Sequence, residues 1–362
     1  MRFSRAALLF VLPLACCLAQ SKEDESKKAL LNDPHYQFSK AELFLAEGNY
    51  AEALRYYKLA ADQGSAEGLC GLGNMYRDGQ GVAQDDKEAV RLYRLSAAKG
   101  WPPAQFNLGV MYDNGRGVPQ DYAEAARWYK ITADLDVADA EYNLGVLYAS
   151  GKGVPQDYKE AARLYKRAAE TRELKEAAFN LAVLYDNGQG IPQDYKEAAR
   201  WYKVAADQGH QEAEFNLAVL YANGQGVAQD LQQAAHWYKL AAEQGQLEAQ
   251  YNIGVFYAEG QGVPQDYKEA AHWYRLAAER GHRDAGFNLG GLYVTGRGLT
   301  ADLEQAYKWL SIAAAKGDKD SAVALQRIAP KMTPQQIERA KIAAVAWKPC
   351  TSREECDARA RQ

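Results

Sequence analysis

Cysteine is scarce in this chain: there are five in 362 residues, and only three lie beyond the first 19 residues. Cys350 and Cys356 are close together near the C-terminus, whereas Cys70 stands alone. A structural zinc site needs four ligands, and a pair of thiols without a nearby second pair does not meet that requirement. The sequence therefore predicts no metal or other cofactor, and Cys350 and Cys356 are candidates for a disulfide.

Clusters of positive charge are also missing. The chain has 43 Lys and Arg residues against 47 Asp and Glu, a formal net charge of −4. Proteins that bind the phosphate backbone carry clustered Lys and Arg, so a nucleic-acid partner is not expected. About half of the residues are apolar (48%) and a quarter are charged (25%), which is typical of neither a disordered nor a membrane-embedded chain.

The first residues form a separate unit. Arg2 and Arg5 precede an apolar stretch at 6–14, and a small-x-small site ends at Ala19. This pattern predicts a signal peptide over residues 1–19, with cleavage leaving Gln20 as the new N-terminus. The apolar stretch is too short for a stable membrane span. We therefore expect an exported protein, either periplasmic or secreted.

A lipoprotein signal is the alternative interpretation of the same residues, with a lipid anchor on Cys16 or Cys17. The residues before Cys16 read Pro13-Leu14-Ala15, a poor match to the usual Leu-small-small-Cys box. Lipidation, and with it attachment to the envelope, therefore ranks second.

One motif repeats along most of the chain. It is clearest at 104–133, AQFNLGVMYDNGRGVPQDYAEAARWYKITA, where two helical segments flank a G-x-G loop. Successive loops are 36, 36, 37, 36, 36 and 36 residues apart by subtraction, and a period of this length predicts a helix-turn-helix solenoid. The second glycine of each loop is Gly81, Gly117, Gly153, Gly190, Gly226, Gly262 or Gly298.

Each half of the repeat has signals for helix ends. Gly115 ends the first helix, and Asp121 begins the second as its N-cap, with Glu124 three residues later as in a capping box. Glu124 also precedes Arg127 by three residues, a spacing that allows ion pairs along a helix. Gly109 is expected to let the first helix approach the small residues 125–126 on the second.

These residues together resemble the Sel1-like repeat (SLR) family, a branch of the tetratricopeptide-type solenoids. The pattern A-x-[FY]-N-L-[GA]-x-x-Y-x-x-G-x-G-V-x-x-D-x-x-x-A-x-x-W-Y-x-x-A-A covers about residues 64–316. The resemblance implies an all-α, right-handed α-solenoid whose first helices line a concave face. It also implies a scaffold for protein complexes, often in bacterial envelopes or in host interaction.

Six segments are predicted. A signal peptide (1–19) precedes a charged linker (20–34), a tetratricopeptide-like hairpin (35–64) and seven repeats (65–317). Capping helices (318–347) follow, and a tail (348–362) holds the candidate disulfide. In the capping segment, Thr333 is a predicted N-cap with Pro334 at the first helical position and Gln336 at the third.

The resemblance places part of each first helix on the partner-binding face. Equivalent positions in successive repeats are called a column here, and three columns on that face are candidates: an aromatic one and two that vary between repeats. The candidate residues for binding a protein or peptide are Phe106, Asp113, Asn114, Tyr142, Ser150, Phe179, Asp186, Asn187, Phe215, Asn223, Tyr251 and Glu259. Solvent-exposed positions without a function would vary between repeats to the same extent, so the choice of these residues is a hypothesis.

Two further columns have a structural and a functional interpretation. An Asn column that includes Asn107 and Asn143 is interpreted as hydrogen bonds between helices, in preference to clamping of a peptide backbone. His236 and His272 share a column, but no third ligand accompanies them, so a metal site is not predicted there. Cys70 lies in the aromatic column and is interpreted as a small buried apolar residue.

Three functions compete at this stage. The favoured one is a non-catalytic interaction scaffold. A scaffold for cell-wall or polysaccharide assembly is the second. The third is a β-lactamase-like hydrolase, as suggested for cysteine-rich SLR relatives, but those carry a cysteine pair in each repeat and this chain does not. The hydrolase motifs G-x-S-x-G and H-E-x-x-H do not occur in the sequence.

Overall fold

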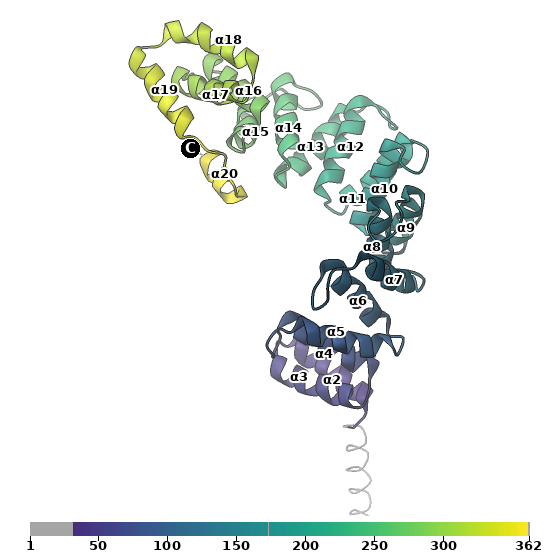
Figure 1. Cartoon of the computed structure of the whole chain (residues 1–362). Coiled ribbons are helices and arrows are strands. Elements are labelled where there is room, and N and C mark those ends of the chain that lie inside the picture. Colours follow the sequence, from purple (N-terminus) through teal and green to yellow (C-terminus); the bar gives the residue numbers. More distant parts are fainter. Residues whose placement is uncertain (1–31, 173, 361–362) are drawn as a thin grey trace, which may run out of the picture. The chain divides into compact units, whose positions relative to one another are not determined.

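The computed structural model describes residues 32–172 and 174–360, and within these ranges the chain is a succession of helices without strands (Figure 1). The predicted all-α class and repeat solenoid are thereby confirmed. The predicted signal peptide, Cys16 and Cys17 lie outside the described residues. Two compact units divide the chain after Arg167. No helix in the described ranges is both long and apolar enough to cross a membrane.

Each repeat contributes a first and a second helix, joined by the G-x-G loop. The first helices are α4 (Ala66–Asp78), α6 (Pro102–Asn114), α8 (Ala138–Ser150), α10 (Lys175–Asn187), α12 (Gln211–Asn223), α14 (Leu247–Glu259) and α16 (Arg283–Thr295). The second helices are α5 (Asp86–Ala97), α7 (Tyr122–Ala133), α9 (Tyr158–Arg172), α11 (Tyr195–Ala206), α13 (Leu231–Glu243), α15 (Tyr267–Glu279) and α17 (Leu303–Ala315). A hairpin of α2 (Pro34–Ala46) and α3 (Tyr50–Asp62) precedes them.

The two glycines of each loop have different structural roles. Gly115 ends α6 in the left-handed conformation (φ +66°), where its N–H donates to the Met111 carbonyl. Gly117 also has a positive φ (+70°), and a Cβ at this position would lie 2.2 Å from the Asp86 carbonyl oxygen in the preceding repeat. The second glycine therefore permits a backbone-to-backbone approach between repeats that no side chain would allow.

The predicted capping box is only half correct. The Asp121 side chain accepts from the N–H groups of residues 123 and 124, as expected of an N-cap. Its own N–H, however, donates to the Tyr112 carbonyl of the preceding helix (3.0 Å), and so needs no partner from Glu124. The Glu124 carboxylate instead pairs with Arg127 (2.9 Å). The same Asp-to-Tyr bond recurs in all seven repeats.

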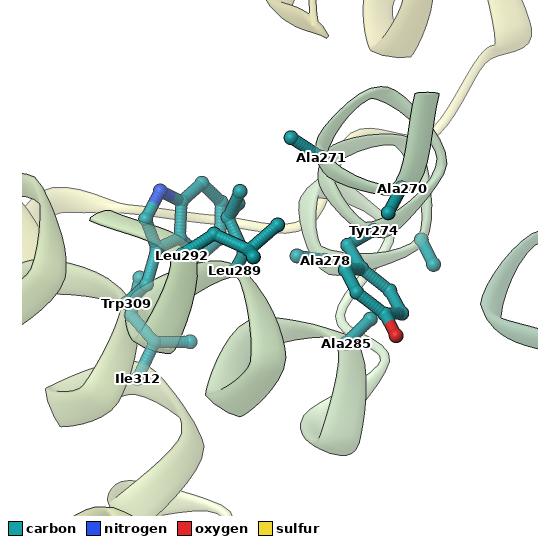
Figure 2. Packing of buried hydrophobic residues seen from close by; sticks show 10 residues of the cluster. Ala270, Ala271, Tyr274, Ala278, Ala285, Leu289, Leu292, Trp309 and Ile312 are labelled. Atoms are coloured by element: carbon teal, nitrogen blue, oxygen red, sulfur yellow. The ribbon is translucent and has the colours of Figure 1, made fainter. Parts of the chain in front are cut away.

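Second helices pack on first helices through tyrosine rings rather than through alanines alone. A Cβ on Gly109 would lie 2.6 Å from the Tyr129 ring, which is its nearest neighbour. The expectation that Gly109 faces residues 125–126 is thus corrected: the missing side chain makes room for an aromatic ring. In the second unit, Tyr274 of α15 packs with Leu289 of α16 and with Trp309 of α17 in one core cluster (Figure 2).

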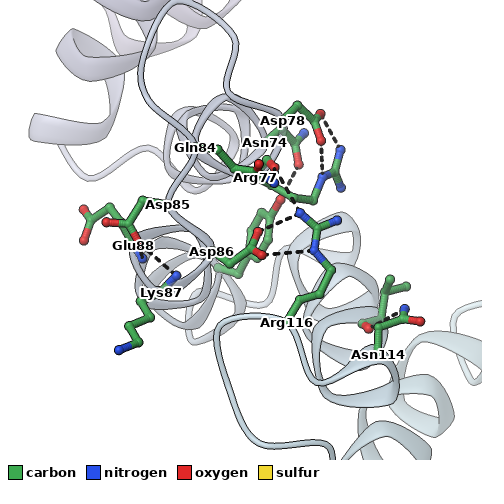
Figure 3. A network of polar contacts seen from close by, with 12 residues as sticks. Asn74, Arg77, Asp78, Gln84, Asp85, Asp86, Lys87, Glu88, Asn114 and Arg116 are labelled. Atoms are coloured by element: carbon green, nitrogen blue, oxygen red, sulfur yellow. Dashed lines mark hydrogen bonds and ion pairs between the residues drawn. The ribbon is translucent and has the colours of Figure 1, made fainter.

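An ion pair also links neighbouring repeats in the first unit. Arg116, in the loop after α6, donates to both carboxylate oxygens of Asp86 at 2.7 and 3.1 Å, and to the Arg77 carbonyl at 3.1 Å (Figure 3). Asp86 is the first residue of α5, so the guanidinium sits beside the same helix start that Gly117 approaches. Steric fit and charge therefore fix the stacking of these two repeats together.

The turn after α7 has an aspartate in a conformation that usually requires glycine. Asp136 adopts the left-handed conformation (φ +58°) that Gly100 and Gly209 hold at the equivalent turn of other repeats. Its carboxylate pairs with Arg167 at 2.6 Å, and Arg167 also pairs with the fully buried Glu141 at 2.7 Å. The turn between α9 and α10 includes residue 173, outside the described ranges.

The C-terminal segment folds back onto the last repeats. It consists of α18 (Lys319–Ile328), the short 3₁₀ helix η1 (Ala329–Lys331), α19 (Pro334–Ala346) and α20 (Arg353–Ala360). Thr333 and Gln336 form the predicted capping box at the start of α19. α18 and α19 pack against α17, while α20 lies against α15. Cys350 and Cys356 form a disulfide, with 5.4 Å between their Cα atoms.

Candidate partner-binding site

The aromatic column is half-buried, so each ring presents only part of its surface. Every described pair has the same geometry: the ring on the first helix tilts against a tyrosine on the second helix of its own repeat. The centroid distances are 5.8 Å for Phe106–Tyr129, 5.9 Å for Tyr142–Tyr165 and Phe179–Tyr202, 5.8 Å for Phe215–Tyr238 and 6.1 Å for Tyr251–Tyr274. These rings belong partly to the core and partly to the surface.

Histidines cover two of these rings from the following repeat. The His210 ring stacks on Phe179 at 4.4 Å, and the His282 ring stacks on Tyr251 at 4.5 Å. Each histidine is also the N-cap of its helix, since its Nδ1 accepts from the backbone N–H three residues later. Burial lowers the pKa of His210, which favours the neutral form that such a cap requires. Neither contact was predicted from the sequence.

Asp113 and Asp186 have a structural partner. Their carboxylates accept from the Tyr129 and Tyr202 hydroxyls at 3.1 and 3.0 Å. Burial is the largest cause that raises the pKa of both tyrosines, and the neighbouring aspartate adds to it. Both aspartates are half-buried. A role in partner recognition would therefore come in addition to this hydrogen bond.

The Asn column links successive repeats, which supports its structural interpretation. Asn143 donates to the hydroxyl of Tyr129 in the repeat before it, and Asn216 does the same for Tyr202. At the start of the first unit, Asn107 donates to the Asn74 side-chain oxygen at 3.1 Å. The amides are thus engaged between helices, where an extended peptide would have to displace them.

The remaining candidates are at the surface. They occupy the last turn of their first helices, and every one is exposed: Asn114, Ser150, Asn187, Asn223 and Glu259. Asn114 donates back to the Val110 carbonyl and Ser150 to that of Val146, so these two side chains fold onto their own helices. Glu259 instead accepts from Gln261 at 2.6 Å.

A cavity of about 440 Å³ hollows this face in the second unit, between α14 and α16. Two predicted residues, Tyr251 and Glu259, line it. The opposite wall includes Phe287 and Arg297, and Gly291 leaves open space, since a Cβ there would meet no atom within 4 Å. The cavity thus combines an apolar interior with one carboxylate and one guanidinium at its rim.

No group in the described part of the chain has the arrangement of a metal or nucleophilic site. No cluster of three His, Cys, Asp or Glu that could hold a metal is found there, and His236 and His272 are exposed. Cys70 is 4% exposed, and burial raises its pKa to about 12, so its thiol stays protonated at neutral pH.

One short motif needs a structural explanation. Ser96-Ala97-Ala98-Lys99 matches the S-x-x-K pattern of some serine hydrolases. Ser96 is fully buried, and its hydroxyl donates to the Ala66 carbonyl at 2.6 Å. Lys99 lies in the exposed turn after α5. The serine hydroxyl is therefore buried in a hydrogen bond between helices and is not accessible to a substrate.

Comparisons with known proteins agree with this architecture. The Sel1 repeat model matches eight segments, at 43–65, 66–101, 102–137, 138–170, 175–210, 211–246, 247–282 and 284–318. The first of these falls within the hairpin that was expected to be tetratricopeptide-like. No curated protein matches the sequence.

Solved structures of similar proteins are repeat proteins of this type. A Sel1 repeat protein from Oxalobacter formigenes is 31% identical, with a TM-score of 0.61 over 86% of this chain and 90% of its own. The protective antigen c5321 of uropathogenic Escherichia coli, which has an SLR fold, is 27% identical over 91% of this chain and 86% of its own, with a TM-score of 0.43. The chain belongs to the Sel1 repeat family, whose members generally mediate protein–protein interaction.

Proposed function

We propose that the chain is a non-catalytic scaffold that binds a protein or peptide partner along its first-helix face, which the family resemblance implies to be the concave one. Repeat proteins of this family are typically non-catalytic. The observation that carries the proposal is the cavity between α14 and α16, because a recognition surface needs pockets as well as exposed polar groups.

The chemistry of the cavity indicates what enters it. The walls formed by Tyr251 and Phe287 suit an apolar side chain, which would displace water from part of the cavity. Glu259 and Arg297 at the rim suit polar groups of the partner backbone on either side. A segment of extended peptide with one apolar anchor fits this arrangement.

Gly291→Phe tests the proposal directly. The new ring would occupy the open space at Gly291, and loss of a helical glycine favours α16 by up to about 1 kcal/mol. The matched control is Gln232→Phe on the exposed side of α13. Residues 20–362 of each variant serve as bait for an envelope extract, followed by mass spectrometry.

A protein retained by the wild-type chain and by Gln232→Phe but lost with Gly291→Phe is the expected result. Its binding site is then mapped with purified components by calorimetry. If all three baits capture the same proteins, or none captures any, the first-helix face is not the recognition surface.

Export is part of the same proposal. It is supported by the predicted signal peptide and by the Cys350–Cys356 disulfide, which persists in oxidising compartments. Expression with a C-terminal tag, cell fractionation and intact mass measurement test it. The expected species begins at Gln20 and is found in the periplasm or medium, whereas an uncleaved cytoplasmic protein would contradict the proposal.

A further inference from the structure

A second and larger cavity, of about 720 Å³, lies where the C-terminal tail meets the last two repeats. Its walls come from α15, from α16, from the loop before α17, from α17 itself and from the tail. Aromatic side chains form one part of the lining: Tyr293, Trp309 and Trp347. The indoles of Trp309 and Trp347 meet edge to face, with centroids 6.0 Å apart.

Charged side chains form the other part, and the positive ones exceed the negative ones. Arg275, Lys308 and Arg359 line the cavity together with Glu279 and Asp302, three positive groups against two negative ones. Asp302 is the N-cap of α17 and accepts from two backbone N–H groups there.

Glu279 binds the C-terminal tail. It is 6% exposed, and its carboxylate accepts from the Trp347 indole at 3.0 Å and from Arg359 at 3.4 Å. Its backbone carbonyl accepts from the Cys350 N–H at 2.9 Å. These contacts hold the tail against α15, while Glu279 acts on Lys308 only at a distance, through its charge.

Comparison along its column shows why Lys308 differs. In four of the six other repeats an arginine of this column pairs with a glutamate three residues earlier, as Arg200 does with Glu197 at 3.3 Å; the other two repeats have His236 and His272 in the column. The other three pairs are Arg91–Glu88, Arg127–Glu124 and Arg163–Glu160. In the last repeat the residue three positions earlier is Gln305, and Lys308 has no ion pair among the described residues. Its ammonium lies over the Trp309 ring, 4.7 Å from the centroid.

Burial raises the free-energy cost of this charge. Lys308 is half-buried, and burial lowers its pKa; the charge of Glu279 opposes this shift, and Arg359 and Arg275 add smaller contributions to it. An anion inside the cavity would offset that cost, because it would stand beside the ammonium as a glutamate stands beside the arginine in four other repeats.

We propose that this cavity binds an organic anion, in which a carboxylate pairs with Lys308 and an attached apolar or aromatic group packs against Trp309 and Trp347. The volume falls in the range of small-molecule sites, about 300–1,000 Å³. A free aromatic acid and the C-terminal carboxylate of a peptide share this chemistry. The site is separate from the first-helix face and does not depend on the function proposed for it.

Three probes test the ligand chemistry by calorimetry on residues 20–362: N-acetylphenylalanine, its neutral amide, and an acetylated tetrapeptide ending in phenylalanine. The free acid is expected to bind and the amide is not. Tighter binding of the tetrapeptide would identify a peptide C-terminus as the source, and equal binding a small acid. Absence of binding by both acids, or equal binding of acid and amide, would overturn the proposal.

Lys308→Gln tests the position of the site, with Arg200→Gln as the matched control from the same column. Loss of a charge-assisted contact is expected to weaken binding of the free acid at least about tenfold. Arg200→Gln and the charge-conserving Lys308→Arg are expected to stay within a few-fold of wild type. Unchanged binding by Lys308→Gln, or an equal loss in Arg200→Gln, would overturn the assignment.

Discussion

Replacing the second loop glycine is expected to damage the contact between repeats, beyond its effect on the turn. In Gly117→Ala, the new methyl group would lie 2.2 Å from the Asp86 carbonyl oxygen and 2.5 Å from its carbon. Gly100 provides the control, because it too has a positive φ (+82°) but a Cβ there would meet no atom within 4 Å. Both glycines lie in the first unit.

The two substitutions share one cost and differ in another. Placing alanine in the left-handed conformation costs about 1–2 kcal/mol at either site. At Gly117 the methyl group must also move more than about 1 Å from Asp86 to reach ordinary contact distance. Such overpacking typically costs a further 1–3 kcal/mol or so. Gly117→Ala should therefore lose about twice as much free energy of unfolding as Gly100→Ala.

Urea unfolding of both variants, followed by far-UV circular dichroism, measures this difference. The urea concentration at the midpoint of unfolding is expected to be highest for the wild type, lower for Gly100→Ala and lowest for Gly117→Ala. Equal losses in the two variants would show that turn conformation alone accounts for the glycine, and the steric argument would be refuted. Hydrogen exchange at the start of α5 then locates the loosened contact.

Three further predictions concern single groups. Tyr129→Phe should destabilise the first unit by about 1–2 kcal/mol in urea unfolding, because Asp113 loses a buried donor; no change would make that bond dispensable. Burial raises the pKa of Glu214 from 4.5 to about 7. The folded state therefore binds this proton more tightly than the unfolded state, and the free energy of unfolding should fall as the pH rises from 4.5 to about 7. Glu214→Gln should abolish that fall, which pH-dependent melting measures; an unchanged profile would contradict it. Cys350→Ser, which removes the disulfide to Cys356, should loosen the tail by about 2 kcal/mol and speed its proteolysis, whereas unchanged cleavage would show that other contacts suffice.

Local signals were sufficient to predict the repeat from sequence. Asp121 as N-cap, Gly115 as helix end and Thr333 with Gln336 as a capping box act within a few residues of chain, so one sequence contains all that determines them. The role of Glu124 was mistaken because its competitor, the Tyr112 carbonyl, comes from the preceding helix.

Contacts between distant segments were not predictable in this way. Tyr251 and Glu259 of the candidate columns lie beside a cavity, but nothing in the repeat pattern indicated that His282 would stack on Tyr251. Likewise, the approach of α20 to α15 depends on a turn and a disulfide after the last repeat. Both require knowledge of which side chains meet across 30 residues or more.

In a repeat protein, the residues of one column can be compared with one another, because they occupy equivalent positions but differ in their side chains. Residues that keep the same contact in every repeat, such as the N-cap aspartates, explain the fold. Residues that lose a contact their column normally makes are the better indicators of function. Lys308 lacks the glutamate partner that four arginines of its column have, and Gly291 lacks the side chain that Val255 has at the same position of the preceding repeat; each lines a cavity. A free scaffold gains no stability from a half-buried charge without an ion pair or from an unfilled hollow, so a ligand that fills either one is the simplest physical reason for both.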